Sequence, residues 1–486
     1  MITIKVEKKR ADRKVASREK QRAKKEQELI AFENRKANDI ERRKQQLEQF
    51  RRMLGGDITY EHVLNFWLPT NIKHLLQSEH SDFYRNKLVG YGDPPKTWIQ
   101  KEKILYIPEQ FSLIDHAPVG YSFIQTSINE LLFGNSNVSF SYKHCKHLDI
   151  GAQLVLDIII RDVIRFLNKC VNSQLLEERW KFLRKRIGLI DANETIEDIR
   201  KILFSVGSLA LHARKTIYYK DIIPYPLCSH SRENDFDPIK AIEQKELDLT
   251  QLVDYVINSL ARVNRRLTDE KLDDLCKIIG EVLINAEEHS TTKNRFSIGY
   301  FQERNENGKH SGLFRLVILN FGKTIYEKFA DPNCPNRIVT DKMKQLSEKY
   351  TKSGFFYKSQ FEEESLWTLY ALQEGVTFIP DKKRGNGSIQ FIESFFSLKG
   401  DDETEEKKSR MTILSGNTKI IFDGTYRIFK KTSGVDTFQY MTFNKTNNIE
   451  DKPDDKYVQF VEHYFPGTVI SARIYFDEED LLNDAN

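Results

Sequence analysis

The chain has 486 residues, which is too long for one ordinary hydrophobic core and predicts two or three domains. Hydrophobic residues make up 39% and charged residues 30% of it, a balance that excludes a wholly disordered chain. The net charge of +4 is small but unevenly distributed, because the first 52 residues hold 18 Lys and Arg against nine acids.

Several features argue against secretion and membrane insertion. The N-terminus has no apolar signal-peptide core, and no stretch reaches the roughly 18 apolar residues that a membrane span requires. The longest apolar run, residues 152–164, contains Asp157 and Arg161 and predicts a buried amphipathic helix. Five cysteines without paired spacing favour reduced thiols: Cys145, Cys170, Cys228, Cys276 and Cys334. We therefore expect a cytoplasmic protein.

Residues 1–54 form a basic arm. They contain much Lys, Arg, Glu and Gln and no Pro, which predicts a long exposed helix whose apolar positions are too sparse for a sustained heptad. Two interpretations stay open. The arm is either a surface that binds nucleic acid or another acidic partner through counterion release, or a solvated helical extension.

Between residues 100 and 225 the pattern alternates as expected of an α/β layer. ILYIPEQFSLID (104–115) predicts a strand, the segment from Val138 predicts a strand, loop and helix, and IEDIRKILF (196–204) predicts a helix. This rhythm resembles a STAS-like domain, the fold of anti-sigma-factor antagonists, which we place with a lead-in segment at 55–228. An unrelated α/β domain is the alternative.

The STAS family carries a phosphoacceptor serine in a short loop before a helix. The matching place here is Asp149-Ile150-Gly151-Ala152, which lacks the hydroxyl, so phosphorylation there is not predicted. Nearby, His144, Cys145 and His147 are residue types that bind zinc, but no second ligand cluster follows at a usual distance, and we do not expect a metal there. The polar, turn-rich residues that follow Cys228 predict a linker at 229–249.

The segment from Asp269 to His289 carries the candidate chemistry. Its apolar residues recur at helical spacing, and Glu281, Asn285 and His289 follow at intervals of four, which places them on one stripe of the helix. The stripe offers a carboxylate that can orient or deprotonate a nucleophile, an amide oxygen for Mg²⁺ and an imidazole for phosphate oxygens. An ordinary amphipathic helix with a polar stripe is the alternative.

The pattern EVLINAEEH (281–289) resembles the N-box of the GHKL superfamily, which includes gyrase, heat-shock chaperone, histidine kinase and mismatch-repair ATPases. The resemblance implies that Glu281 is the general base or orients the attacking water. It also implies that Asn285 ligates Mg²⁺ and that His289 lies beside the bound ATP.

A second segment follows in the order that this family shows. After a predicted strand, Asn320, Gly322 and Thr324 stand where the family has Asp-x-Gly-x-Gly, whose aspartate hydrogen-bonds the adenine amino group. Asn can accept that hydrogen bond through its carbonyl oxygen but lacks the charge, and Thr in place of Gly narrows the approach of the backbone. Both departures bear on adenine affinity.

A third segment resembles the second glycine box of the family, in which backbone amides close on phosphates. It comprises Arg384, Gly385, Asn386 and Gly387. Two later runs, 411–423 and 466–476, alternate with the period of two typical of half-buried strands. The second run resembles the closing Gly-Thr strand of the ATPase domain, with Gly467 and Thr468 in structural roles.

These observations predict an α/β (α+β) fold with five segments. They are a basic helical arm (1–54), a STAS-like α/β domain (55–228), a linker (229–249), a Bergerat-type α/β sandwich (250–476) and an acidic tail (477–486).

The resemblance implies a bacterial ATP-binding regulatory protein. It is expected to be a Mg²⁺-dependent GHKL ATPase or an anti-sigma-type protein kinase whose STAS-like domain is a partner in cis. The alternatives are a catalytically weak, nucleotide-responsive scaffold and a nucleic-acid-binding stress or defence protein that uses the arm. Expected partners are ATP, a protein partner or substrate, and further subunits in a homo-oligomer or hetero-complex, with no membrane.

Overall fold

A computed structural model describes most of the chain. The described residues are Glu41, Gln45, Glu48, and the ranges 59–84, 101–172, 183–207, 217–231, 238–263, 266–288, 292, 294–306, 309–351, 361–378, 391–392, 409–433 and 436–477. The chain divides into two compact units, residues 1–68 with 165–184 and residues 69–164 with 185–486. The fold is mixed α/β, as predicted.

Little of the first unit is described. Of the predicted basic arm, only Glu41, Gln45 and Glu48 are described, and they are helical. Helix α2 (Tyr60–Trp67) begins with a reciprocal capping box, in which Thr59 Oγ1 accepts from the His62 amide and His62 Nδ1 accepts from the Thr59 amide. The remainder of the predicted arm lies outside the described residues.

The second unit begins with a parallel α/β layer. One sheet has the strand order β1-β3-β5, and β2 and β4 form a short parallel pair. The strands are β1 (Glu102–Tyr106), β2 (Gln110–Phe111), β3 (Asn137–Ser141), β4 (His147–Leu148) and β5 (Ile187–Ile190). The helices are α3 (Thr70–Gln77), α4 (Ala117–Phe133), α5 (Ile150–Asn172) and α6 (Glu197–Ser205). The predicted strand at 104–115 is therefore two strands, and the sequence analysis did not anticipate α4 or β5.

Helix α5 confirms the predicted buried helix. Residues 151–160 are buried without exception, although the run contains a carboxylate. Asp157 accepts a hydrogen bond of 2.9 Å from Gln153 Nε2, and Asp162 accepts one of 2.9 Å from Asn71 Nδ2 on α3. The carboxylates inside the apolar run are thus hydrogen-bonded, as buried polar groups require.

A five-stranded antiparallel sheet follows, in the order β6-β7-β8-β12-β9. Its strands are β6 (Ile222–Ser231), β7 (Asn294–Glu306), β8 (Lys309–Phe321), β9 (Arg410–Phe422) and β12 (Val458–Asp477). A separate hairpin joins β10 (Phe429–Ser433) to β11 (Asp436–Tyr440). The end of β6 lies in the segment predicted as a linker at 229–249. Of the acidic tail predicted at 477–486, only Asp477 is described, and it ends β12.

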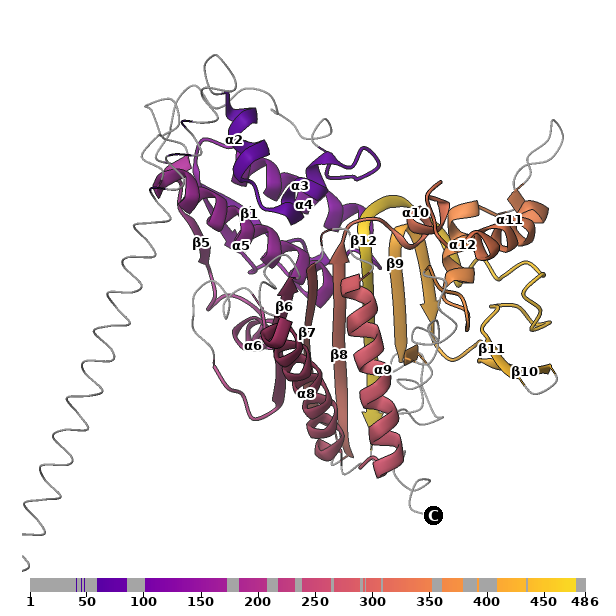
Figure 1. Ribbon diagram of the computed structural model, residues 1–486. Coiled ribbons are helices and arrows are strands. Elements are labelled where there is room, and N and C mark those ends of the chain that lie inside the picture. Colours follow the sequence, from indigo (N-terminus) through magenta and orange to yellow (C-terminus); the bar gives the residue numbers. More distant parts are fainter. Residues whose placement is uncertain are drawn as a thin grey trace, which may run out of the picture. The chain divides into compact units, whose positions relative to one another are not determined.

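Helices α8 (Pro238–Arg262) and α9 (Asp269–Glu288) run across one face of this sheet (Figure 1). Helix α8 begins inside the predicted linker, where Glu243 and Glu246 are exposed and Asp248 is buried in an ion pair with Arg295. The predicted helix at 269–289 is confirmed as α9. Three more helices are α10 (Ile325–Ala330), α11 (Arg337–Thr351) and α12 (Glu363–Ala371), and α12 packs on β9 and β12.

Alternation along the strands gives the sheet two different faces. On β8, Phe314, Leu316 and Ile318 belong to the core shared with α8 and α9. The intervening side chains belong to the opposite face, which meets the α/β layer. There Arg161 of α5 lies over the ring of Phe296, 5.2 Å from its centroid. One hydrophobic core of the second unit therefore lies on the helix side of the sheet.

Two predictions about the chain as a whole can be compared with the structure. All five cysteines are free, as expected of reduced thiols. Within the described residues, no helix combines the length and apolar character needed to cross a membrane.

A substitution at Gly467 tests the packing between β8 and β12. Its φ is 144°, and a Cβ there would lie 2.1 Å from the Asn320 carbonyl oxygen. We predict that Gly467→Ala lowers the free energy of unfolding by about 2–4 kcal/mol, through backbone strain and overpacking. Chemical denaturation measures the change.

Gly280→Ala is the matched control. Gly280 lies inside α9, and its added Cβ would come no closer than 3.9 Å to Leu249 Cδ2. Alanine is the better helix former, so this variant should gain up to about 1 kcal/mol. Equal losses in the two variants would contradict the assigned role of Gly467.

Candidate functional site

The structure describes part of the predicted nucleotide site. Glu281 and Asn285 lie within α9, one turn of the helix apart. Their side chains, all of His289, and the segment from Arg384 to Gly387 lie outside the described residues. Helix α9 is fixed on the sheet by Leu275, Ile279, Val282 and Leu283, which are buried in the core.

Asn320 links three segments that the sequence keeps far apart. It ends the apolar run of β8 and is 5% exposed. Its Nδ2 donates a hydrogen bond of 2.8 Å to the Ala286 carbonyl of α9, 34 residues away. Its Oδ1 accepts one of 3.1 Å from the Thr468 amide of β12, 148 residues away. Asn285 and Asn320, which the sequence analysis assigned to one site, and Thr468, which it assigned to the closing strand, therefore lie on segments that meet at this amide.

The two bonds explain why an amide occupies position 320. A carboxylate could accept from the Thr468 amide but could not donate to the Ala286 carbonyl, because an ionised carboxylate has no proton to give. Asparagine supplies both a donor and an acceptor. Asparagine rather than aspartate at position 320 therefore suits the way in which α9 is held to the sheet.

Gly322 makes the turn that follows β8. Its φ of 137° lies in a region that side chains disfavour, and its amide donates to the Pro466 carbonyl at 3.2 Å. His74 of α3 hydrogen-bonds to the backbone of Gly322. Burial lowers the pKa of His74, while this hydrogen bond and the nearby charge of Glu327 act in the opposite direction. Helix α3 thus lies against the turn that the sequence predicts to approach a nucleotide.

Thr324 is a helix cap. It is fully buried, its Oγ1 accepts from the Glu327 amide at 3.1 Å, and Glu327 Oε2 accepts from the Thr324 amide at 2.8 Å. This reciprocal capping box starts α10. It accounts for threonine where the family pattern has its second glycine. The Thr-x-x-Glu spacing is visible in the sequence, but it was not identified there.

A group of acidic side chains beside this cap was also missed by the sequence analysis. Tyr464 donates a hydrogen bond of 2.7 Å to Glu327, although the two residues are 137 positions apart. Glu364 accepts one of 2.7 Å from the Asn417 amide. Burial raises the pKa of Glu364 to about 7, with a further contribution from the charge of Glu327. A carboxyl that titrates near neutral pH therefore lies at this end of the sheet, and no single motif marks it.

Within the described residues, no group of three or more His, Cys, Asp and Glu side chains is placed to hold a metal ion. At the HCKH segment, Cys145 is buried and its thiol lies 3.6 Å from the His147 carbonyl oxygen. Burial raises the pKa of Cys145 to about 12, which disfavours the thiolate that zinc requires.

Comparisons of the chain with protein-family models, with curated proteins and with solved structures find no match.

The raised pKa of Glu364 predicts how the free energy of unfolding depends on pH. Its pKa of about 7 in the folded protein exceeds the ordinary value of 4.5, so the folded state binds the additional proton between these values. The free energy of unfolding should therefore fall as pH rises from about 5 to 8, by no more than about 3 kcal/mol from this group. Glu364→Gln should remove this part of the dependence. Unfolding curves across this range measure it, and exposed Glu450 provides the control variant Glu450→Gln. An unchanged pH profile in Glu364→Gln would refute the assignment.

Asn320→Asp tests the amide bridge. The variant loses the donor to the Ala286 carbonyl and places a buried carboxylate against that oxygen, so we predict a loss of about 1–3 kcal/mol in the free energy of unfolding. Asn447 is exposed, and Asn447→Asp should change stability by less than about 0.5 kcal/mol. Equal stability of Asn320→Asp and the wild type at neutral pH would argue against the bridge.

Proposed function

We propose that the chain binds ATP with Mg²⁺ at a Bergerat-type site. The site is formed by α9, the end of β8 and the part of β12 that begins at Gly467. The supporting observation is the hydrogen-bonded junction at Asn320, which joins these segments through one buried amide. The order of elements adds support, because an N-box-like helix, a hairpin, a glycine turn and a closing Gly-Thr strand follow one another as in the GHKL pattern.

The proposed roles follow the pattern residue by residue. Glu281 orients or deprotonates the nucleophile, and Asn285 ligates Mg²⁺ through its amide oxygen. His289 and the segment from Arg384 to Gly387 lie beside the phosphates. When bound, Mg²⁺ would neutralise part of the negative charge of the phosphates.

Asn320 is proposed to contact the adenine base. A carbonyl oxygen has two lone pairs, and the Thr468 amide occupies one of those on Asn320 Oδ1. The second can accept from an exocyclic amino group. The bond from Nδ2 to the Ala286 carbonyl fixes which way the amide faces, so the acceptor is oriented before a ligand arrives.

The α/β layer is proposed as the partner in cis of an ATPase or anti-sigma-type kinase. It belongs to the same compact unit as the sheet, and specific contacts join them. Asp82 pairs with His463 of β12 at 2.9 Å, and Asn294 of β7 donates to Asn71 of α3 at 2.9 Å. These contacts support a fixed partner rather than one that must be recruited.

A nucleotide-responsive scaffold is the second candidate. The observation that favours it is that Asn320 and Thr324 both hold the fold together, one as a bridge and the other as a helix cap. Because both residues stabilise the fold, they suit a site in which nucleotide binding alters the fold and ATP hydrolysis is slow.

Calorimetric titration with a non-hydrolysable ATP analogue and Mg²⁺ tests nucleotide binding. We predict a micromolar Kd, about −8 kcal/mol, and at least about tenfold weaker binding in Asn285→Ala. Asn447→Asp, the exposed control, should bind like the wild type. A protein that gives neither heat nor thermal stabilisation with the analogue would refute the proposal.

An ATP hydrolysis assay on the same protein distinguishes the ATPase from the nucleotide-responsive scaffold. Glu281→Ala should keep the affinity for the analogue and lose ATP hydrolysis, because the residue acts on the nucleophile rather than on binding. Equal hydrolysis traces for Glu281→Ala and the wild type would leave binding intact and favour the scaffold.

A further inference from the structure

Three arginines lie in register across neighbouring strands of the five-stranded sheet. Arg473 of β12 is the direct partner of Arg315 on β8 and of Arg410 on β9. Because directly opposed residues share a face, all three side chains belong to the side that meets the α/β layer. We call this set the arginine row. Asn320 occupies the alternate set of β8 positions, so the row lies on the opposite face from the proposed nucleotide site.

The row is electrostatically unfavourable without an anion. Like charges directly opposite on adjacent strands destabilise a sheet, and neighbouring strands are only about 4.8 Å apart. All three side chains are partly buried, which reduces screening by water. Burial lowers the pKa of Arg473, and the charges of Arg315 and Arg410 lower it further. The charges of Tyr475 and Asp115 act in the opposite direction, but both neighbouring arginines repel the central guanidinium.

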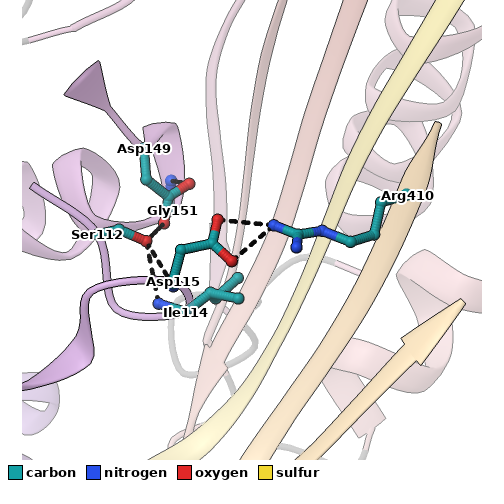
Figure 2. Close-up of polar contacts among 6 residues, drawn as sticks. All are labelled: Ser112, Ile114, Asp115, Asp149, Gly151 and Arg410. Atoms are coloured by element: carbon teal, nitrogen blue, oxygen red, sulfur yellow. Dashed lines mark hydrogen bonds and ion pairs between the residues drawn. The ribbon is translucent and has the colours of Figure 1, made fainter. Parts of the chain in front are cut away.

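The α/β layer supplies only part of the countercharge. Arg410 Nη2 donates to both carboxylate oxygens of Asp115, at 2.7 and 2.6 Å (Figure 2). Both partners of this pair remain partly open to solvent, at 28% and 46% exposure. Among the ion pairs of the described residues, this is the one that involves the row. An exposed pair of this kind contributes little to stability and can be exchanged for another anion.

Asp149 is the second acidic group near the row. It precedes α5 and accepts hydrogen bonds from Gly151 and Ser112 (Figure 2). Burial raises the pKa of Asp149, while the Gly151 amide and the charge of Arg315 act in the opposite direction. Three guanidinium groups thus meet two carboxyl groups, and burial shifts that of Asp149 toward its neutral form. A net positive charge remains.

Unused donors are present within the row itself. The Nε atoms of Arg315 and Arg473 are buried and make no hydrogen bond. A buried guanidinium donor without a partner is costly, and proteins leave few of them. Both unused donors belong to adjacent side chains on one face. An oxyanion that reached either Nε atom would supply the missing acceptor.

We propose that the arginine row is a binding site for a phosphate group. A carboxylate offers two oxygens, whereas a phosphate monoester offers three acceptor oxygens and a charge of about −1.5 to −2, which matches three guanidinium groups and the remaining positive charge. Asp115 occupies part of the site and competes with the ligand for Arg410. The neighbouring α/β layer covers the bound group from the other side. This site does not depend on the proposed nucleotide site.

Thermal stabilisation and calorimetry of the full-length protein with inorganic phosphate, in a low-salt buffer free of other oxyanions, test the proposal. The wild type should gain thermal stability with rising phosphate, as a ligand that binds only the folded state requires. Arg473→Gln should weaken phosphate binding at least about tenfold, because it removes a charge-assisted donor. The same variant should unfold at an equal or higher temperature than the wild type when phosphate is absent, because the repulsion in the row is relieved. A merely structural arginine would give the opposite shift.

Two further variants complete the test. Asp115→Asn removes the competing carboxylate and should tighten phosphate binding severalfold, so the proposal stays testable if Arg473→Gln fails to fold. Arg262→Gln is the matched control, because Arg262 forms an exposed ion pair with Glu303 outside the row. It should keep the phosphate response. The proposal is overturned if about 10 mM phosphate leaves the wild type unchanged, if Arg473→Gln responds normally, if Asp115→Asn does not tighten binding, or if Arg262→Gln loses the response.

Ribose 5-phosphate distinguishes a free phosphate from a phosphate ester. Tighter binding of the ester than of inorganic phosphate, lost in Arg473→Gln, identifies a phosphorylated small molecule as the ligand. Equal binding identifies the free anion. Asn285→Ala should keep the phosphate response, so failure of the nucleotide site and failure of this site are separable.

Discussion

Strand β8 is buried on both faces and paired on both edges, and the rest of the second unit is organised around this constraint. Its neighbours are β7 and β12, whose pairing with it extends along nearly its whole length. Phe314, Leu316 and Ile318 of β8 belong to the core with α8 and α9, whereas Arg315 lies on the face toward the α/β layer. A strand in this position cannot shift by one residue without exchanging the two faces. The register that places Asn320 against α9 is therefore the same register that places Arg315 in the arginine row.

Local patterns predicted the elements of this unit well. The apolar spacing of residues 269–289 identified α9, and the period of two at 411–423 and 466–476 identified β9 and β12. The region expected to be a linker was interpreted less well, because charged residues on an exposed helix surface have the composition of a loop. Glu243 and Glu246 of α8 are exposed, whereas its later residues Leu252, Val256 and Leu260 are buried in the core. Composition alone does not separate the two cases.

The site depends on information that a local pattern lacks. The sequence analysis grouped Asn285, Asn320 and Thr468 by resemblance, but the amide bridge depends on pairings over 34 and 148 residues. The capping box at Thr324 could have been predicted from the sequence, because its four-residue pattern is local. The arginine row was not, because Arg315, Arg410 and Arg473 become neighbours only when the strand order β8-β12-β9 and its register are known. The strand predicted at 466–476 contains Arg473, but the one predicted at 411–423 begins after Arg410, and neither prediction indicates a shared row.

Position 320 shows how a fold limits the chemistry of its own site. The amide donates to α9 and accepts from β12, and only a side chain with both functions completes the junction. An aspartate would carry the charge that strengthens a bond to an adenine amino group, but it would leave the Ala286 carbonyl facing a second acceptor in a buried place. The arginine row is the converse case, since its charges repel one another and the fold gains little from holding three of them together. At Asn320 the two structural hydrogen bonds determine the residue, and the proposed ligand would use the remaining lone pair of Oδ1. In the row the structural requirement is weak, so the cost of keeping three arginines together points to a ligand that neutralises them.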